Sequence, residues 1–150
     1  MHFFDVITIL CTGLMTGNEL AVSLFIHPTL RHLDDRGRAR AVSLFARSLG
    51  KGMPVWYIVS LALITAEAFL RRHEPAFPLL VVAAAIWLAI ILITVVVLVP
   101  INNRIAALDP SALSVNWLND HRRWETLHRW RIAWLFAATA CLTYAIVGFK

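Results

Sequence analysis

Long apolar segments alternate with short polar ones along this sequence, at about residues 3–26, 54–70, 77–99 and 132–149. A helix needs roughly 20 mostly apolar residues to cross a bilayer, so each segment is a candidate membrane-spanning helix. The third is the clearest, because it carries no charge and only Thr94 is polar beyond the backbone. The pattern therefore predicts an all-α fold, a four-transmembrane-helix bundle that forms one integral-membrane domain over residues 1–150.

Two further helices are expected at the membrane surface. Residues 31–52 carry arginines opposite an apolar face, which predicts a short amphipathic surface helix between the first two spans, ending at Gly50. Pro54 suits the first turn of a helix and is expected to begin the second span. Residues 117–131 are expected to form an extended entrance helix that leads from the headgroup region into the fourth span.

The first span carries a stripe of polar side chains. Its members lie three or four residues apart, within an arc of roughly 100°; they are Asp5, Thr8, Thr12, Thr16, Glu19, Ser23 and His27. A lipid-facing helix does not tolerate such a stripe, so this face is expected to look into the bundle or into a wet cavity. Glu19 alone costs about 2.5 kcal/mol or more inside a span unless it finds a partner. It is either a hydrogen-bonded lock between helices or part of a functional pocket.

Composition and charge agree with a membrane protein. Hydrophobic residues make up 59% of the 150 residues and charged residues 15%, against about 45–50% and about 25% in soluble domains. Eleven of the 14 lysines and arginines fall on the side of the bundle where the first and third spans end. This excess predicts cytoplasmic long connections and outside termini, in a bacterial inner membrane. No nucleic-acid partner is expected, because the basic residues lie beside the spans and form no nucleic-acid motif.

A second group of polar side chains precedes the fourth span. Spacings of 4, 3, 4 and 3 residues put them on one helical face; they are Trp117, His121, Trp124, His128 and Arg131. Glu125 and His128 have the Glu-x-x-His spacing of di-iron bundles, but such sites need two pairs and this chain has one. We therefore expect no metal. The candidate ligands, if one binds, are Glu19, His27, His121, Glu125 and His128.

Topology brings several of these groups to one end of the bundle. The first and third spans end, and the fourth begins, at the same membrane face. The polar residues expected at similar height there are His27, Asn102, Asn103, His128 and Arg131. Glu19 lies about 12 Å deeper than His27, at 1.5 Å per residue. Together these groups are expected to line a pocket that opens toward the cytoplasmic face.

Four motifs, taken in order, resemble those of one family. They are Gly13-x-x-x-Gly17-Asn18 in the first span, His27-Pro28 at its exit, Pro100-Ile101-Asn102-x-x-Ile105 after the third span, and Trp124-x-x-x-His128-x-x-Arg131 before the fourth. The ordered set resembles the anthrone oxygenase-like integral membrane proteins, long catalogued as a domain of unknown function. The usual exit dipeptide of that family is Asn-Pro, so His27 departs from the pattern.

The resemblance implies a four-helix membrane core and a chemistry. Fungal members of the family oxidise an anthrone to an anthraquinone with dioxygen, without metal or flavin, so no cofactor is expected. Carried over, the motifs mark His128, Asn102 and Arg131 as catalytic: His128 accepts a proton and the other two stabilise the resulting oxyanion. The expected substrate-binding residues are Asn18, Glu19, His27 and Trp124.

Two classes of function fit these observations. The first is a membrane oxygenase or oxidoreductase that acts on a flat lipophilic aromatic or quinone-like substrate. The second is a non-enzymatic membrane module, either a partner subunit or a small-molecule binder. A transporter fits less well, because four spans are few and the sequence lacks the paired broken helices of inverted repeats. Gly13 and Gly17 form a small-residue ridge, suited to close packing of helices within the bundle or to a homo-oligomer.

Overall fold

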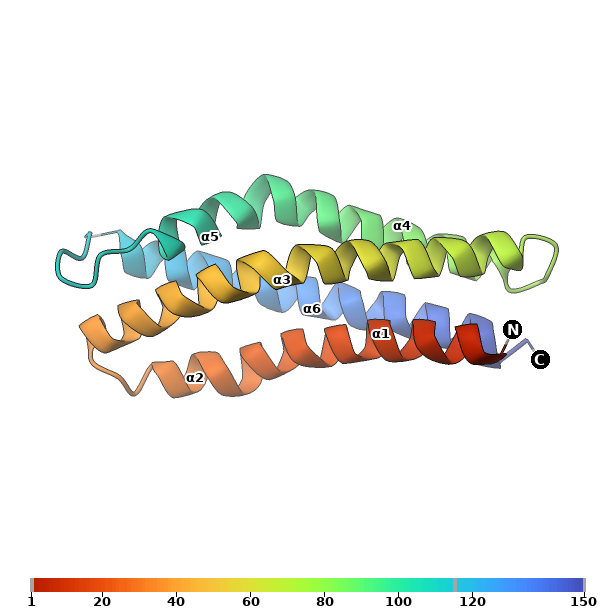
Figure 1. Cartoon of the computed structure of the whole chain (residues 1–150), viewed down its shortest axis with the longest axis horizontal. Helices are drawn as coiled ribbons and strands as arrows, with labels where there is room; N and C mark the ends of the chain where they lie inside the picture. Colours follow the sequence, from red (N-terminus) through yellow and green to blue (C-terminus); the bar gives the residue numbers. More distant parts are fainter. Residues whose placement is uncertain (1, 115, 150) are drawn as a thin grey trace.

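The computed structural model describes residues 2–114 and 116–149, and every regular element in these ranges is helical. The elements are α1 (His2–Ala21), η1 (Val22–Ile26), α2 (His27–Leu30), α3 (Asp35–Leu70), α4 (Phe77–Ile93), η2 (Thr94–Leu98), α5 (Val99–Ala106) and α6 (Trp117–Val147), where η denotes a π-helical segment. They build four long antiparallel rods, with both termini beside the α3–α4 connection at one end (Figure 1). The α2–α3 and α5–α6 connections lie at the other end. The predicted all-α fold is confirmed.

Four helical stretches within the described residues are long and apolar enough to cross a membrane, namely Phe3–Leu30, Asp35–Leu70, Phe77–Ala106 and Trp117–Val147. Large apolar side chains cover the outside of the bundle, among them Phe3, Phe25 and Val96. A contiguous apolar surface of this kind is costly in water and is stable against lipid tails. The chain is therefore an integral membrane protein, as the hydrophobic pattern predicted.

One boundary differs from the sequence-based prediction. The expected surface helix and the expected second span form a single helix, α3, which runs through Gly50 and Pro54. Its N-terminal half packs on α5, where Ser43 and Arg47 both donate hydrogen bonds to the carbonyl of Ala106, at 3.0 and 2.7 Å. These bonds hold that half of α3 along the bundle instead of flat on the membrane surface. Tertiary contacts thus override the local stop signals.

The first and third rods widen just before a proline. In η1 and η2 a main-chain N–H donates to the carbonyl five residues earlier instead of four. The N–H of His27 donates to the carbonyl of Val22, and the N–H of Val99 donates to the carbonyl of Thr94. Pro28 and Pro100 come one residue after that N–H. Because a proline lacks an N–H and its ring clashes with the carbonyl four residues earlier, a wider turn accommodates it. The two π-helical segments line one internal cavity.

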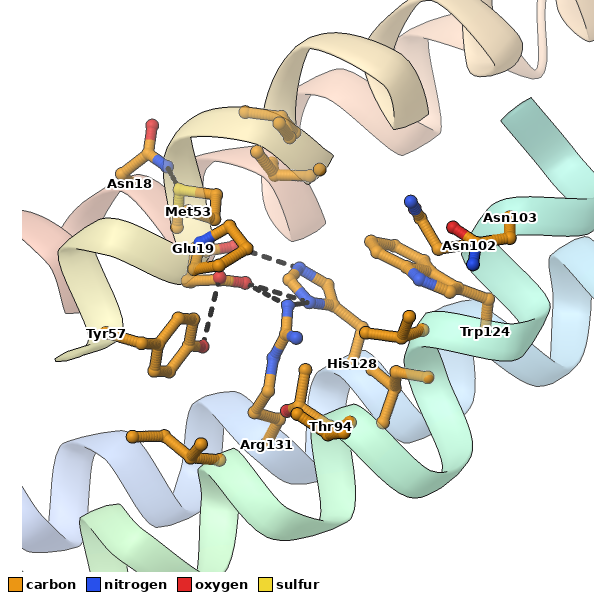
Figure 2. A pocket seen from close by; sticks show the side chains of 18 of the residues that line it. Asn18, Glu19, Met53, Tyr57, Thr94, Asn102, Asn103, Trp124, His128 and Arg131 are labelled. Carbon is orange, nitrogen blue, oxygen red and sulfur yellow. Dashed lines mark hydrogen bonds and ion pairs between the residues drawn. The ribbon is translucent and has the colours of Figure 1, made fainter.

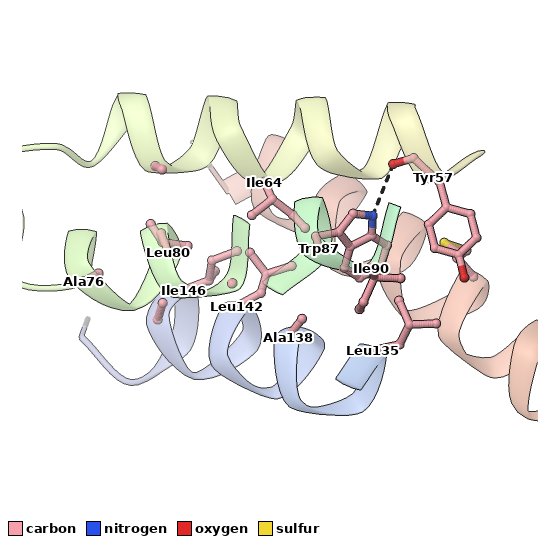
Figure 3. Packing of buried hydrophobic residues seen from close by; sticks show 14 residues of the cluster. Tyr57, Ile64, Ala76, Leu80, Trp87, Ile90, Leu135, Ala138, Leu142 and Ile146 are labelled. Carbon is pink, nitrogen blue, oxygen red and sulfur yellow. Dashed lines mark hydrogen bonds between the residues drawn. The ribbon is translucent and has the colours of Figure 1, made fainter. Parts of the chain in front are cut away.

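A hydrophobic core fills the bundle between these wide turns and the termini (Figure 3). Trp87 and Leu80 of α4 meet Ile64 of α3 and Leu142 of α6, and all four side chains are fully buried. The indole Nε1 of Trp87 donates a hydrogen bond to the main-chain carbonyl of Tyr57 at 3.2 Å, which satisfies the polar atom of this large side chain. The packing sets how α3, α4 and α6 are rotated, and hence which of their side chains meet beyond the core.

The polar stripe of the first rod faces the interior, as predicted. Ser23 is half-buried, and the buried members are Asp5, Thr8, Thr12, Thr16, Glu19 and His27. The threonine hydroxyls find partners close by; Thr16, for example, lies 3.0 Å from the hydroxyl of Thr139 on α6. Most of the stripe therefore serves contacts between helices, which satisfies polar groups that lipid would leave without partners.

An ion-pair network joins α1 to the end of α3, at the end of the bundle where the chain termini lie. Arg71, which is buried just after α3, donates to Asp5 at 2.9 Å and to Glu67 at 3.3 Å. Burial alone would lower the pKa of the Arg71 guanidinium, but the hydrogen bonds with these two carboxylates raise the pKa above its usual value. The Asp5 end of the stripe therefore serves a structural contact, and the Glu19 end remains the candidate for a functional role.

The small-residue ridge of α1 is not used within the bundle. At Gly13 and Gly17, no atom of another described element lies within 4 Å of the position that a Cβ would take. Both glycines therefore have open space beside them. Homo-oligomerisation through this ridge stays a prediction.

Candidate functional site

A buried carboxylate joins three side chains near the middle of the bundle (Figure 2). Glu19 of α1 accepts hydrogen bonds from Nη2 of Arg131 on α6 at 2.6 Å and from the hydroxyl of Tyr57 on α3 at 3.1 Å. Nδ1 of His128, also on α6, lies 3.0 Å from the Glu19 oxygen that Arg131 contacts. Glu19 and His128 are 3% and 1% exposed. A charge that is costly inside a membrane protein is thus matched by a cation and two further polar groups.

The neighbours of the His128 ring define where its proton sits. Nε2 lies 3.2 Å from the main-chain carbonyl of Glu19, which only accepts, so Nε2 carries a proton. Nδ1 lies 2.9 Å from Nη2 of Arg131, which only donates. In the neutral ring Nδ1 therefore offers a lone pair to Arg131, and a proton taken up at Nδ1 would face the Glu19 carboxylate.

A cavity of about 200 Å³ opens beside the carboxylate. The exposed residues of its lining come from α3 on one side, at Gly50, Pro54 and Ile58, and from η2 and α5 on the other, at Val95, Val99 and Asn103. We infer from these exposed residues that the mouth lies between α3 and η2–α5, on the side of the bundle. Whether it meets the cytoplasmic face stays a prediction. For scale, an apolar cavity of about 150 Å³ admits benzene, so this space accepts an aromatic ring.

Two polar atoms of the cavity wall are left without partners. Nε of Arg131 and the hydroxyl of Thr94 are buried, and neither has a hydrogen-bond partner among the described residues. A buried polar group without a partner costs about 1–3 kcal/mol. Both residues line the cavity, so these two atoms are candidate hydrogen-bond donors to a ligand.

Three further predicted site residues line the same cavity, namely Asn18, Asn102 and Trp124. Nδ2 of Asn18 lies 3.6 Å from the sulfur of Met53, and Nδ2 of Asn102 donates to a main-chain carbonyl of α3 at 3.2 Å. The Trp124 ring stacks on the His128 ring, with centroids 4.6 Å apart. The structure thus brings six of the seven predicted site residues to one cavity; what each of them does there stays a prediction.

His27 is the seventh, and it lies elsewhere. It lines a second, smaller cavity of about 40 Å³ together with His121, and its Nδ1 is 3.5 Å from Oε1 of Glu125. The reason is the wide turn η1 between Glu19 and His27. A π-helical turn takes more residues than an α-helical one, so the 100° per residue assumed along the stripe does not hold across it. Trp124 lines both cavities and stands between them.

The candidate metal ligands divide in the same way. Glu19 and His128 are held by each other and by Arg131 beside the large cavity. His27, His121 and Glu125 form a separate group, whose ligand atoms all lie within 4.8 Å of one another. The five candidates named from the sequence therefore do not form one centre.

Two wall residues, Tyr57 and Thr94, were missed by sequence reasoning. Tyr57 is buried and bonds the carboxylate, although a tyrosine three residues into the expected second span has an ordinary role at a membrane boundary. Thr94 stood out as the polar residue of the third span, but no sequence signal showed which way it points. Their positions depend on the rotation of α3 and η2, which the core packing sets.

The fold and the site together define a class of protein: a small four-helix integral membrane protein with a buried charged network beside a laterally open cavity. A family model described as anthrone oxygenase matches residues 43–141, about two-thirds of the chain. The chain belongs to the anthrone oxygenase family, as the sequence motifs predicted. The match includes Asn102, His128 and Arg131, whereas Asn18 and Glu19 lie outside it. No individual curated protein and no solved structure matches the chain.

Proposed function

We propose that the protein is a membrane oxygenase that oxidises a flat, lipophilic, anthrone-like aromatic ketone with dioxygen. One observation carries the proposal: the wall of a single cavity holds both a proton-accepting pair and free hydrogen-bond donors. The pair is Glu19 and His128. The donors are Nε of Arg131 and the hydroxyl of Thr94, which have no partner among the described residues. A base beside hydrogen-bond donors is what removal of a proton from a weak carbon acid requires. Membership of the anthrone oxygenase family supports the same chemistry.

The proposed reaction starts with loss of a proton from the methylene carbon of the substrate. This leaves an enolate whose negative charge rests on the ketone oxygen. The enolate gives electrons to dioxygen, a C–O bond forms at the former methylene carbon, and the peroxide takes up a proton. Loss of water from this hydroperoxide turns the carbon into a second carbonyl. One substrate and one dioxygen yield one quinone and one water, and all electrons come from the substrate, so no external reductant is needed.

Four polar residues of the wall have a proposed part in the first step, and the Thr94 hydroxyl is a further donor to the substrate. Glu19 meets the substrate and passes the proton to Nδ1 of His128, which lies 3.0 Å from its Oε2. His128 acts through the carboxylate because its Nδ1 faces Oε2 of Glu19, while its Nε2 faces a main-chain carbonyl. The enolate oxygen is stabilised by Nε of Arg131 and by the second amide hydrogen of Asn102, whose first is bonded to α3.

The substrate is expected to enter from the bilayer, through the mouth between α3 and η2–α5. We further propose that the end with the α2–α3 and α5–α6 connections is cytoplasmic in a bacterial inner membrane, because most of the basic residues gather there. Both termini then lie outside. Labelling of tagged termini in intact cells tests this orientation, and termini that stay protected would overturn it.

Oxygen consumption by the purified protein, with anthrone as the probe, tests the proposed chemistry. His128→Ala removes the proton acceptor and is expected to lower turnover by about 100-fold or more, the range of general base catalysis. Arg129→Ala changes an exposed neighbour on the same helix and should keep full activity. Size-exclusion profiles and unfolding midpoints check that both variants fold. Unchanged turnover in His128→Ala would reject the roles proposed for this wall.

A small-molecule binder is the second candidate function. One observation favours it: both oxygens of the Glu19 carboxylate already have partners within 3.1 Å, a resting state that also suits a pocket without chemistry. Saturable binding of anthrone, followed by tryptophan fluorescence, without any uptake of oxygen would support this candidate over the oxygenase.

A further inference from the structure

A second cluster of buried polar side chains lies beside Trp124, outside the large cavity. It consists of His27 from α2 and of His121 and Glu125, which lie four residues apart on one face of α6. Their exposed fractions are 8%, 2% and 9%. Oε1 of Glu125 lies 3.5 Å from Nδ1 of His27 and 3.4 Å from Nε2 of His121.

The facing atoms of this cluster are unsatisfied. Nδ1 of His27, Nε2 of His121 and Oε1 of Glu125 are all buried, and none has a hydrogen-bond partner within the described part of the chain. Each such atom costs about 1–3 kcal/mol when it has no partner. Three such atoms within 4.8 Å of one another are more than packing requires, and a single bound ion would satisfy all three.

We propose that these three side chains bind a divalent transition-metal ion of the Zn²⁺ type. Imidazole nitrogens and carboxylate oxygens sit about 2.0–2.2 Å from such an ion, so neighbouring donors of a tetrahedral site lie about 3.3–3.5 Å apart. The separations of 3.4 and 3.5 Å at Glu125 match that edge, whereas a good N–H···O hydrogen bond is shorter, at about 2.7–3.2 Å. Two histidines and one carboxylate are an established ligand set for zinc and for non-haem iron.

The surroundings complete the site. Nη2 of Arg31 donates to Oε2 of Glu125 at 2.8 Å, which leaves Oε1 for the ion and fixes the orientation of the carboxylate. The cavity of about 40 Å³ beside His27 and His121 exceeds the roughly 10–15 Å³ that one water needs, so a water can fill the fourth position. His128 takes no part, because protein groups engage both of its ring nitrogens.

The test uses the full-length protein in detergent, with its affinity tag removed and bound metal stripped by a chelator. Titration with Co²⁺, as a coloured stand-in for Zn²⁺, is expected to show saturable visible absorption that excess Zn²⁺ abolishes. His121→Ala and Glu125→Gln should each weaken binding about 100-fold or more. Glu125→Gln keeps an oxygen for Arg31, so it is expected to fold. His32→Ala, an exposed histidine five residues after His27, is the matched control and should bind as the parent does.

Two results would overturn the proposal. One is a parent protein that shows no saturable binding of Co²⁺ or Zn²⁺ at about 1 mM, in which case the cavity holds a trapped water only. The other is binding that stays unchanged in both His121→Ala and Glu125→Gln, which would put the ion elsewhere. Neither readout involves oxygen consumption, so the metal site and the oxygenase proposal stand or fall separately.

Discussion

Replacing Glu19 with glutamine isolates the contribution of the buried charge. The substitution keeps the size of the side chain and one carbonyl oxygen, but it removes the negative charge that faces Arg131 at 2.6 Å. The two side chains are 4% and 11% exposed, so water does little to compensate for the lost charge. Breaking a buried ion pair by removing one partner costs about 3–5 kcal/mol, because the other charge is left uncompensated.

This magnitude is a large part of the free energy of unfolding, which is about 5–15 kcal/mol for a typical domain. At about 2–4 °C per kcal/mol for a chain of this size, the unfolding midpoint of Glu19→Gln should fall by roughly 6–20 °C. Glu74→Gln is the matched control, because it makes the same chemical change in a carboxylate that is 39% exposed and 3.1 Å from Arg71. The control should cost no more than about 1 kcal/mol.

A double-variant cycle separates the lost pair from the lost charge. Arg131→Met keeps an apolar stem in place of the cation, and Glu19→Gln with Arg131→Met removes both charges. Since a buried pair replaced by neutral side chains is often no less stable, the double variant should recover most of the loss of Glu19→Gln. Unfolding followed by circular dichroism in one detergent measures the cycle. Two results would refute the reasoning. One is a Glu19→Gln variant whose free energy of unfolding lies within about 1 kcal/mol of that of the parent. The other is a double variant in which the losses of the two single variants simply add.

Two further predictions concern the cavity wall. Gly52→Ala should stabilise α3 by about 0.5–1 kcal/mol, because a helical glycine is replaced and nothing lies within 4 Å of the new Cβ. Gly50→Ala should gain less stability and should weaken binding of anthrone, because its new Cβ meets Nδ2 of Asn102 at 3.2 Å. Unfolding midpoints and a binding titration compare the two glycine variants. Thr94→Val removes a hydroxyl without a partner among the described residues, so it should raise the unfolding midpoint by a degree or more while lowering oxygen uptake with anthrone. A variant that loses stability and keeps full activity would contradict the part assigned to Thr94.

The inner part of the site was predictable because its residues are unusual inside a membrane span. Glu19 carries a charge inside the first span, where charge is costly, and the helical spacing alone put it on an inward face. Arg131 was expected just before the fourth span, and the family motif marked it as a site residue. The same spacing failed at His27, because the wide turn η1 intervenes. Pro28 was the sequence signal for an irregular turn, but a proline alone does not determine whether a helix ends, bends or widens.

The continuity of α3 was not predictable from the sequence for a different reason. Gly50 and Pro54 are local signals for a break, and in isolation they would favour one. The helix continues because Ser43 and Arg47, within the two turns that precede Gly50, are bonded to the end of α5. Contacts between segments about 60 residues apart in the sequence leave no local trace, which is also why Tyr57 and Thr94 were not predicted as site residues.

Under the proposed oxygenase function, a lateral mouth between α3 and η2–α5 changes what substrate concentration means for the protein. A lipophilic molecule that enters from the bilayer is sampled at its mole fraction in lipid, so its partition coefficient enters the apparent KM. Extra lipid or detergent at constant total substrate dilutes the pool that the cavity meets and should slow uptake without touching any residue. Rates from different preparations are then comparable only as a function of the ratio of substrate to lipid.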